Sequence, residues 1–273
     1  NLIRQKGGSR IFLVSADSAD FNESSARLQS EARRYHLQLE KPGFNTGHHG
    51  SIHVSQKVAS LMMKVSFDHL VRAANDTTLS LTKIKPGHVA YKTSMEVKTV
   101  KTENVLGFLE GSDKKNEVIV ITAHYDHIGK RRSGEGDRIN NGADDDGSGT
   151  VAVMELARVF AKARADGNGP RRSILFMAVA GEEIGLFGSK YYTENPVFPL
   201  QNTIVNLNAD MIGRRDEQHK DSPPYVYVIG ADKLSVELNQ ISENINATYT
   251  KLLFDYTYND ENHPDRLYYR SDH

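Results

Sequence analysis

Two largely apolar runs constrain the fold of this chain more than any other feature. They occupy residues 117–123 (Glu-Val-Ile-Val-Ile-Thr-Ala) and 172–180 (Arg-Ser-Ile-Leu-Phe-Met-Ala-Val-Ala). Strands that are apolar on both faces are typical of a parallel sheet covered by helices on both sides. Residues 150–165, between the two runs, form a largely apolar stretch that we predict to be a helix. We therefore predict an α/β fold, a three-layer sandwich with a mostly parallel central sheet.

The same alternation of strand and helix continues toward the end of the chain. It predicts strands at 104–110, 203–209 and 225–229, and helices at 185–192 and 233–245. The first hundred residues differ, because their patterns predict mainly strands, at 10–14, 51–54, 79–83 and 90–97, with one helix at 54–63. We therefore expect a smaller β-rich accessory unit over residues 1–100, which precedes the α/β domain over residues 101–273.

Composition limits the chemistry that this chain can use. It contains no cysteine, so disulfides, thiolate nucleophiles and cysteine-based zinc sites are excluded. Any metal must therefore be held by His, Asp and Glu. The net charge of −1 indicates no nucleic-acid partner. No run of residues is long and apolar enough to span a bilayer.

An acidic segment stands directly before the predicted helix at 150–165. Asp144, Asp145 and Asp146 follow one another there, between Gly142 and Gly147. Adjacent carboxylates repel one another, and a helix N-terminus stabilises only part of this charge. A divalent cation would account for the remainder. Considered alone, however, the segment is better explained as an acidic turn that caps the helix, and we expect Asp144 and Asp146 to be cap and turn residues.

Three other predicted strands are also followed by residues that can bind metal. The carboxyl ends of parallel strands meet at one edge of a sheet, where ligands bind. Metal-binding side chains at four strand or loop ends of one sheet are hard to explain by structure alone, so we predict a metal site there. Its candidate residues are His124 and Asp126 after 117–123, Asp145 in the acidic segment, Glu182 and Glu183 after 172–180, and Asp210 after 203–209. We interpret His127 as structural.

The local spacing suggests how some of these side chains act. In extended chain His124 and Asp126 share a face, so the carboxylate can orient the imidazole. Glu182 and Glu183 point apart, so one can bind metal while the other faces a bound water. A lone Asp210 after an apolar strand is costly unless it is paired or bound to metal.

Four motifs together resemble the co-catalytic di-zinc aminopeptidase family, which includes bacterial leucyl aminopeptidase, aminopeptidase Y and glutamate carboxypeptidase. They are His-Tyr-Asp at 124–126, Asn-Gly-Ala-Asp-Asp-Asp-Gly-Ser-Gly at 141–149, Gly-Glu-Glu at 181–183 and Asn-Ala-Asp-Met-Ile-Gly at 208–213. They occur in the family's order, and the similarity covers residues 100–273. Residues 1–100 resemble the tail of the protease-associated domain that many members carry.

The resemblance implies a zinc-dependent exopeptidase, most simply an aminopeptidase, whose substrate is a peptide with a free N-terminus. Two zinc ions would hold a bridging hydroxide that attacks the peptide carbonyl. The implied roles are Asp145 as the bridging ligand, His124 and Asp210 at one ion, Glu183 at the other, Glu182 as general base and acid, and Asp126 as the residue behind His124. Members with accessory domains are commonly secreted or periplasmic, and we expect the same here.

One departure from the family pattern concerns the last metal ligand. A further histidine normally completes the second zinc site near the C-terminus, but this chain ends at Tyr269–His273, which resembles the preceding segment. We therefore expect both ends of the chain to be cut, with His273 or His263 as the alternative ligands. Two other functions share the fold: a glutaminyl-cyclase-like transferase with one zinc, and a non-catalytic, receptor-like binding module. The complete set of visible ligands, together with Glu182, disfavours both.

Overall fold

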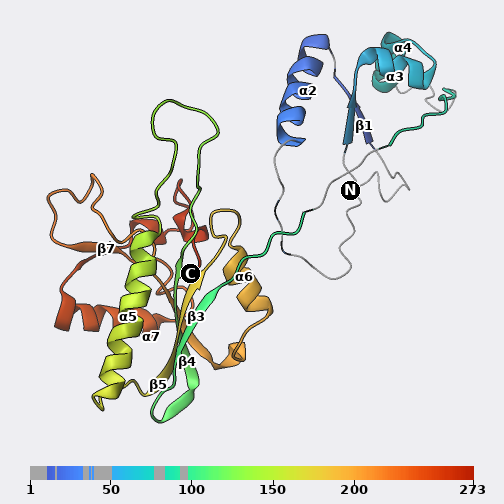
Figure 1. The fold of residues 1–273 in the computed structure, drawn as a ribbon. Coiled ribbons are helices and arrows are strands. Elements are labelled where there is room, and N and C mark those ends of the chain that lie inside the picture. Colours follow the sequence, from blue (N-terminus) through green and yellow to red (C-terminus); the bar gives the residue numbers. More distant parts are fainter. Residues whose placement is uncertain are drawn as a thin grey trace. The chain divides into compact units, whose positions relative to one another are not determined.

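The computed structural model describes residues 11–15, 17–32, 37, 39, 51–76, 84–92 and 98–273. The chain divides into two compact units, residues 1–99 and residues 100–273 (Figure 1).

The first unit is more helical than the sequence predicted. Strands β1 (Ile11–Val14) and β2 (Ser51–Val54) are present as expected and pair in parallel. Three helices accompany them: α2 (Ser18–Ala32), α3 (Gln56–Met63) and α4 (Phe67–Asn75). Over the described residues, the expectation of a β-rich unit is therefore wrong. Residues 90–92 of one predicted strand are not in a strand, whereas residues 93–97 and the predicted strand at 79–83 lie outside the described residues.

The second unit is built around a four-stranded sheet. Its strands are β3 (Val105–Leu109), β4 (Lys114–His124), β5 (Arg172–Val179) and β6 (Thr203–Asn208), in the order β3-β5-β4-β6. β4 is parallel to both of its neighbours, and only the edge strand β3 runs antiparallel. The mostly parallel sheet is thus confirmed, with β4, β5 and β6 ending at the same edge.

Helices cover both faces of this sheet, which confirms the three layers. On one face α5 (Gly147–Ala165) packs Val153, Ala157 and Phe160 against apolar side chains of β4 and β5. On the other, Tyr192 of α6 (Phe187–Glu194) belongs to the cluster that contains Leu175. Alternate residues of β4 and β5 point to opposite faces, so uninterrupted apolar runs are needed to fill both layers.

The remainder of the second unit consists of short elements. After η2 (Leu200–Asn202) and β6, strand β7 (Tyr225–Tyr227) pairs in parallel with β8 (Leu253–Asp255), which the sequence analysis missed. Helix α7 (Val236–Ile245) continues into the π-helical turn η3 (Asn246–Thr250), followed by the 3-10 turns η4 (Thr257–Asn259) and η5 (Leu267–Tyr269). Over the described residues, every helix is too short or too polar to cross a membrane.

The packing predicts which leucine the fold depends on. Leu175 is only 1% exposed in the core, whereas Leu200 at the surface is 44% exposed. Truncating Leu175 to alanine leaves a cavity, so Leu175→Ala should lower the free energy of unfolding by about 2–5 kcal/mol. Leu200→Ala, which removes the same atoms, should change it by about 0.5 kcal/mol or less. Urea unfolding followed by circular dichroism measures both, and equal losses would contradict this description of the core.

Candidate metal centre

The predicted metal-binding side chains come together where β4, β5 and β6 end. His124 is the last residue of β4, and Asp210 lies two residues after the end of β6. Glu182 and Glu183 follow β5, and Asp145 lies in the turn that leads into α5. The ends of the parallel strands and the turn before α5 therefore bring all five side chains to one edge of the sheet, as the sequence indicated.

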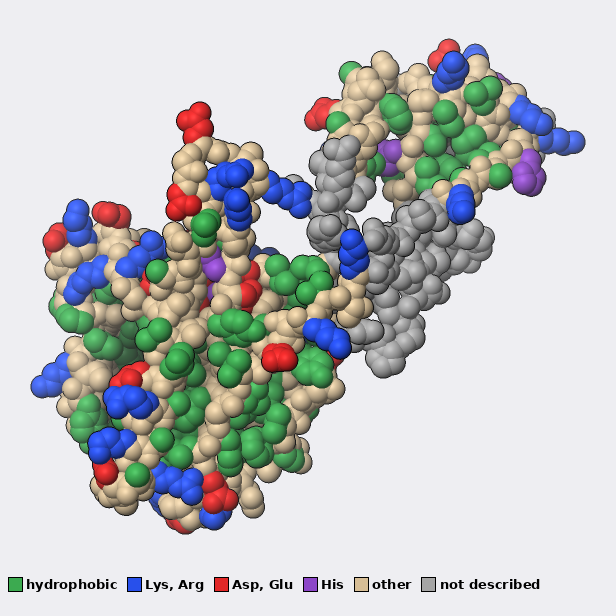
Figure 2. All heavy atoms as spheres, viewed as in Figure 1, with side chains coloured by type: hydrophobic (Ala, Val, Ile, Leu, Met, Phe, Trp, Pro, Cys, Tyr) green, Lys and Arg blue, Asp and Glu red, His purple; other side chains and the backbone are tan. Residues whose placement is uncertain are grey.

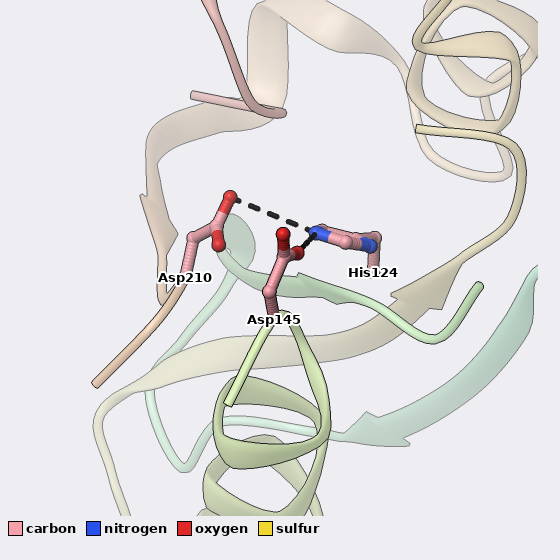
Figure 3. Close-up of side chains that lie close together, drawn as sticks. All are labelled: His124, Asp145 and Asp210. Atoms are coloured by element: carbon pink, nitrogen blue, oxygen red, sulfur yellow. Dashed lines mark ion pairs between the residues drawn. The ribbon is translucent and has the colours of Figure 1, made fainter. Parts of the chain in front are cut away.

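Three of these side chains form a first group of potential ligands. Nε2 of His124 lies 3.2 Å from Oδ1 of Asp145 and 3.7 Å from Oδ2 of Asp210 (Figure 3). The other ring nitrogen, Nδ1, is 3.0 Å from the carbonyl oxygen of Asp126 and must donate to it, because a carbonyl only accepts. Nε2 is therefore the ring nitrogen available to a metal, and its orientation is fixed from behind.

The electrostatics of this group favour a cation. Burial on its own would lower the pKa of His124, since the side chain is only 1% exposed. The nearby negative charge of Asp210, whose Oδ2 lies 3.7 Å from Nε2, outweighs burial and raises that pKa to about 10. The carboxylates thus stabilise a positive charge here, which a proton on the His124 ring can supply. A divalent cation in the same place would neutralise them more fully.

A second group includes a residue that the sequence analysis set aside. Nδ1 of His127 lies 2.7 Å from Oε1 of Glu183 and 3.8 Å from Oδ2 of Asp145. Although close, the two buried atoms Nδ1 and Oε1 do not meet in hydrogen-bond geometry. Such atoms can instead share a third, central partner, as metal ligands do. The potential ligand atoms of each group lie within 4.8 Å of one another.

Asp145 lies between the two groups. Its Oδ1 faces His124, and its Oδ2 faces His127. This is the arrangement that a bridging carboxylate requires, and donor sets of imidazole and carboxylate suit zinc. The only signal in the sequence for His127 was its position just beyond the end of β4, one residue after Asp126.

Asp126 differs from its expected role. We predicted that its carboxylate would orient His124, but Oδ1 of that carboxylate is 3.9 Å from Nδ1 and the carbonyl group makes the hydrogen bond instead. The carboxylate accepts hydrogen bonds from the backbone N–H groups of Glu182, at 3.1 Å, and Glu183, at 3.4 Å. Asp126 therefore fixes the turn that carries both glutamates.

Ser271 also holds the site together, and no motif in the sequence pointed to it. Its backbone N–H donates to Oε1 of Glu182 at 3.2 Å, and its hydroxyl donates to Oδ2 of Asp210 at 2.5 Å. The hydroxyl in turn accepts from Nδ2 of Asn208 at 2.7 Å. Its φ of 68° is left-handed, a costly conformation for serine that such contacts offset.

Glu182 has the environment of a proton-transferring group. Burial raises the pKa of Glu182 to about 7; the charge of His124 opposes this shift, and that of Asp272 adds to it. A carboxyl group that titrates near neutral pH can both accept and return a proton. The hydrogen bond from Ser271 fixes one of its two oxygens.

Asp146 ties three ligand-bearing segments to one another. Its carboxylate is 1% exposed and accepts from the backbone N–H groups of Gly149 at 3.0 Å, His124 at 3.2 Å and Met211 at 3.2 Å. The bond from Gly149 makes it the N-cap of α5, which confirms the expected role. The carboxylate of Asp144 accepts a hydrogen bond from the backbone N–H of Gly213 and forms an ion pair with Arg214. It belongs to neither group of potential metal ligands.

The two other candidate histidines have different partners. Nε2 of His273 lies 2.8 Å from the carbonyl oxygen of Tyr268, and Nδ1 of His263 lies 3.8 Å from Asp265. In the part of the chain that the structure describes, neither belongs to a group of potential metal ligands.

Comparison with known proteins agrees with this site. The sequence profile of Peptidase family M28 matches residues 104–273. The chain therefore belongs to peptidase family M28, and the resemblance to zinc aminopeptidases is confirmed at this level.

Two similar proteins are described as a zinc metalloprotease and as an aminopeptidase. A probable zinc metalloprotease of Pyrenophora teres f. teres (strain 0-1) is 40% identical over 131 residues, which cover 46% of this chain and 25% of that protein. Aminopeptidase YwaD of Bacillus subtilis (strain 168) is 31% identical over 156 residues, which cover 56% of this chain and 30% of that protein. Among solved structures, LapB from Legionella pneumophila is 30% identical and has a TM-score of 0.44. The match covers 56% of this chain and 38% of LapB. This chain thus spans less than a third of the two relatives in the sequence comparison.

The contacts of Asp146 predict an unusually costly cap substitution. Asp146→Ala would leave the buried N–H groups of His124 and Gly149 and the partly buried one of Met211 without acceptors, and should lower the free energy of unfolding by about 3 kcal/mol or more. Asp146→Asn keeps one oxygen acceptor and should cost less. Ser235→Ala removes the ordinary cap of α7 and should cost about 1 kcal/mol. If urea unfolding gave the same loss for Asp146→Ala and Ser235→Ala, Asp146 would be a helix cap and nothing more.

Proposed function

We propose that this protein is a zinc-dependent aminopeptidase that hydrolyses the N-terminal residue from peptides. The observation that carries the proposal is the position of Asp145, which faces His124 with one oxygen and His127 with the other. Membership of peptidase family M28 gives this pair of ligand groups a peptide substrate. The description of the Bacillus subtilis relative as an aminopeptidase supports cleavage at the N-terminus.

In this proposal Asp145 would serve both of two zinc ions. His124 and Asp210 would complete the ligands of the first ion, and Glu183 and His127 those of the second. The unsatisfied Nδ1 of His127 and Oε1 of Glu183 support the second position. When bound, the two ions would supply the Lewis acidity that activates water and polarises the scissile carbonyl.

The protein's own side chains handle the proton. Glu182 accepts a proton from the attacking water at its carboxylate and returns it to the leaving amine. Ser271 fixes Oε1 of Glu182, and Asp126 fixes the backbone N–H of the same residue. The surrounding carboxylates attract the positively charged amine of a peptide N-terminus, which would favour exopeptidase cleavage.

Family resemblance supports two further parts of the proposal. Residues 1–100 would be part of a protease-associated-like accessory domain, and residues 101–273 would be the zinc peptidase domain. The protein would act in a secreted or periplasmic location. The second ligand group and Glu182 leave the cyclase-like transferase and the receptor-like module without a supporting observation.

The ligand groups predict the zinc content. Elemental analysis of the purified protein should give two zinc ions per chain. His127→Ala removes a ligand from the more exposed second group. It should weaken zinc binding at that group while the zinc ion at the first group is retained. His273→Ala serves as the matched control and should leave both. One equivalent in the unmodified protein would contradict the two-ion site, and unchanged zinc binding in His127→Ala would contradict its role as a ligand.

The position of Glu182 predicts a variant that binds metal without turning over substrate. Glu182→Gln keeps the size of the side chain and removes its ability to accept a proton. We expect kcat for leucine anilide to fall by about 10²- to 10⁴-fold while the zinc content is unchanged. Glu237→Gln, an exposed substitution on α7, should retain full activity. A fully active Glu182→Gln variant would rule out the general-base assignment.

A further inference from the structure

A hairpin rises directly from the metal centre. Residues 129–140 form two antiparallel arms, in which Arg131 N–H donates to the Arg138 carbonyl and Asn140 N–H to the Gly129 carbonyl, both at 2.9 Å (Figure 1, the green loop). One arm begins two residues after His127, and the other leads into the turn that holds Asp145. Because the side chains of His127 and Asp145 are 3.8 Å apart, the base of the hairpin lies at the second ligand group.

The hairpin presents an excess of positive charge. It carries four cationic side chains against two acidic ones, and Figure 2 shows Lys and Arg side chains gathered on it. The four are Lys130, Arg131, Arg132 and Arg138. Within the described residues, none of them forms an ion pair with a carboxylate. By contrast, Arg158 and Lys162 on α5 are both paired with acidic neighbours.

Two of the four cations are engaged within the hairpin, and two remain available. Arg131 donates to the carbonyl oxygen of Asp137 at 2.8 Å, and Arg138 donates to that of Arg132 at 3.4 Å. These bonds stiffen the ribbon. The ammonium of Lys130 and the guanidinium of Arg132 are exposed and make no such contact in the described structure. Both can therefore bind an external anion.

The distances suit a peptide that runs along the hairpin. Extended chain advances about 3.3 Å per residue, so Lys130 and Arg132 lie on the order of 3–10 Å beyond the base. A substrate whose first carbonyl lies at the metal centre would advance at the same rate. Its second to fourth residues would then come alongside the two cations. Its amine would face carboxylates and its other end would face positive charge, which orients a short peptide.

We propose that Lys130 and Arg132 bind a carboxylate on the substrate downstream of the scissile bond. That carboxylate is either the C-terminus of a short peptide or an acidic side chain in an extended one. The inference rests on the proposed aminopeptidase function and adds a substrate class to it: peptides that are negatively charged after their first residues.

Four tripeptides and one anilide test the proposal with the zinc-loaded protein. Leu-Gly-Gly is compared with Leu-Gly-Gly-amide, which tests the C-terminal carboxylate. Leu-Gly-Glu-amide is compared with Leu-Gly-Gln-amide, which tests the side chain. We expect kcat/KM to be about three- to tenfold higher for the charged member of at least one pair, and the difference to shrink in high salt. Whichever pair shows the preference identifies the source of the carboxylate.

A double variant assigns the preference to the hairpin. K130Q/R132Q should reduce the charged-to-neutral ratio of kcat/KM to about one. R158Q/K162Q removes the same two charges from α5 and should keep the ratio of the unmodified protein. Leucine anilide has no downstream residue and reports the peptidase activity itself. Two results would overturn this inference alone, provided that the anilide is cleaved. One is an equal kcat/KM for the charged and neutral peptides of both pairs, and the other is a charged-to-neutral ratio that K130Q/R132Q leaves unchanged. No cleavage of any substrate would overturn the proposed function and this inference with it.

Discussion

The buried carboxylate of Asp146 is the interaction on which the site depends most. It accepts N–H groups from the end of β4, the first turn of α5 and the segment after β6. Each of these segments carries one ligand of the first group, so a single side chain sets their mutual distances. Burial and the charge of Asp210 raise the pKa of Asp146 to about 7. A charge at Asp146 is therefore costly there, and a cation nearby would lower that cost.

The same balance of charge governs the other carboxylates of the centre. Burial raises the pKa of Glu182, Glu183 and Asp272, since each would carry its charge in a poorly solvated place. Asp210 is the exception, because the nearby charge of His124 and the hydrogen bond from Ser271 outweigh its burial and lower its pKa. A protein that gathers so many acids around two histidines loses stability unless cations or protons compensate them. The site therefore favours bound cations or protons on physical grounds that are independent of family resemblance.

The layers of the fold could be predicted from the sequence because they depend on local patterns. The apolar runs of β4 and β5 and the helical spacing of α5 each indicate their own structure, and parallel strands must deliver their next residues to one edge. The contacts of His127 and Ser271 depend instead on which segments meet, and no local pattern encodes that. The role of Asp126 was missed for a related reason: its position in the sequence does not determine whether its carbonyl or its carboxylate faces His124.

The precision of the centre follows from where its side chains are attached. His124 ends a strand whose preceding residue, Ala123, is fully buried and pairs with Ala178 of β5, so its backbone has little freedom. Asp145 precedes a long helix that packs on the same strand, whereas Glu182 and Glu183 lie on a turn without regular structure. The contacts of Asp126 and Ser271 converge on that turn. They supply by hydrogen bonding the rigidity that β4 and α5 supply by packing, as a site that must hold its side chains in fixed positions requires.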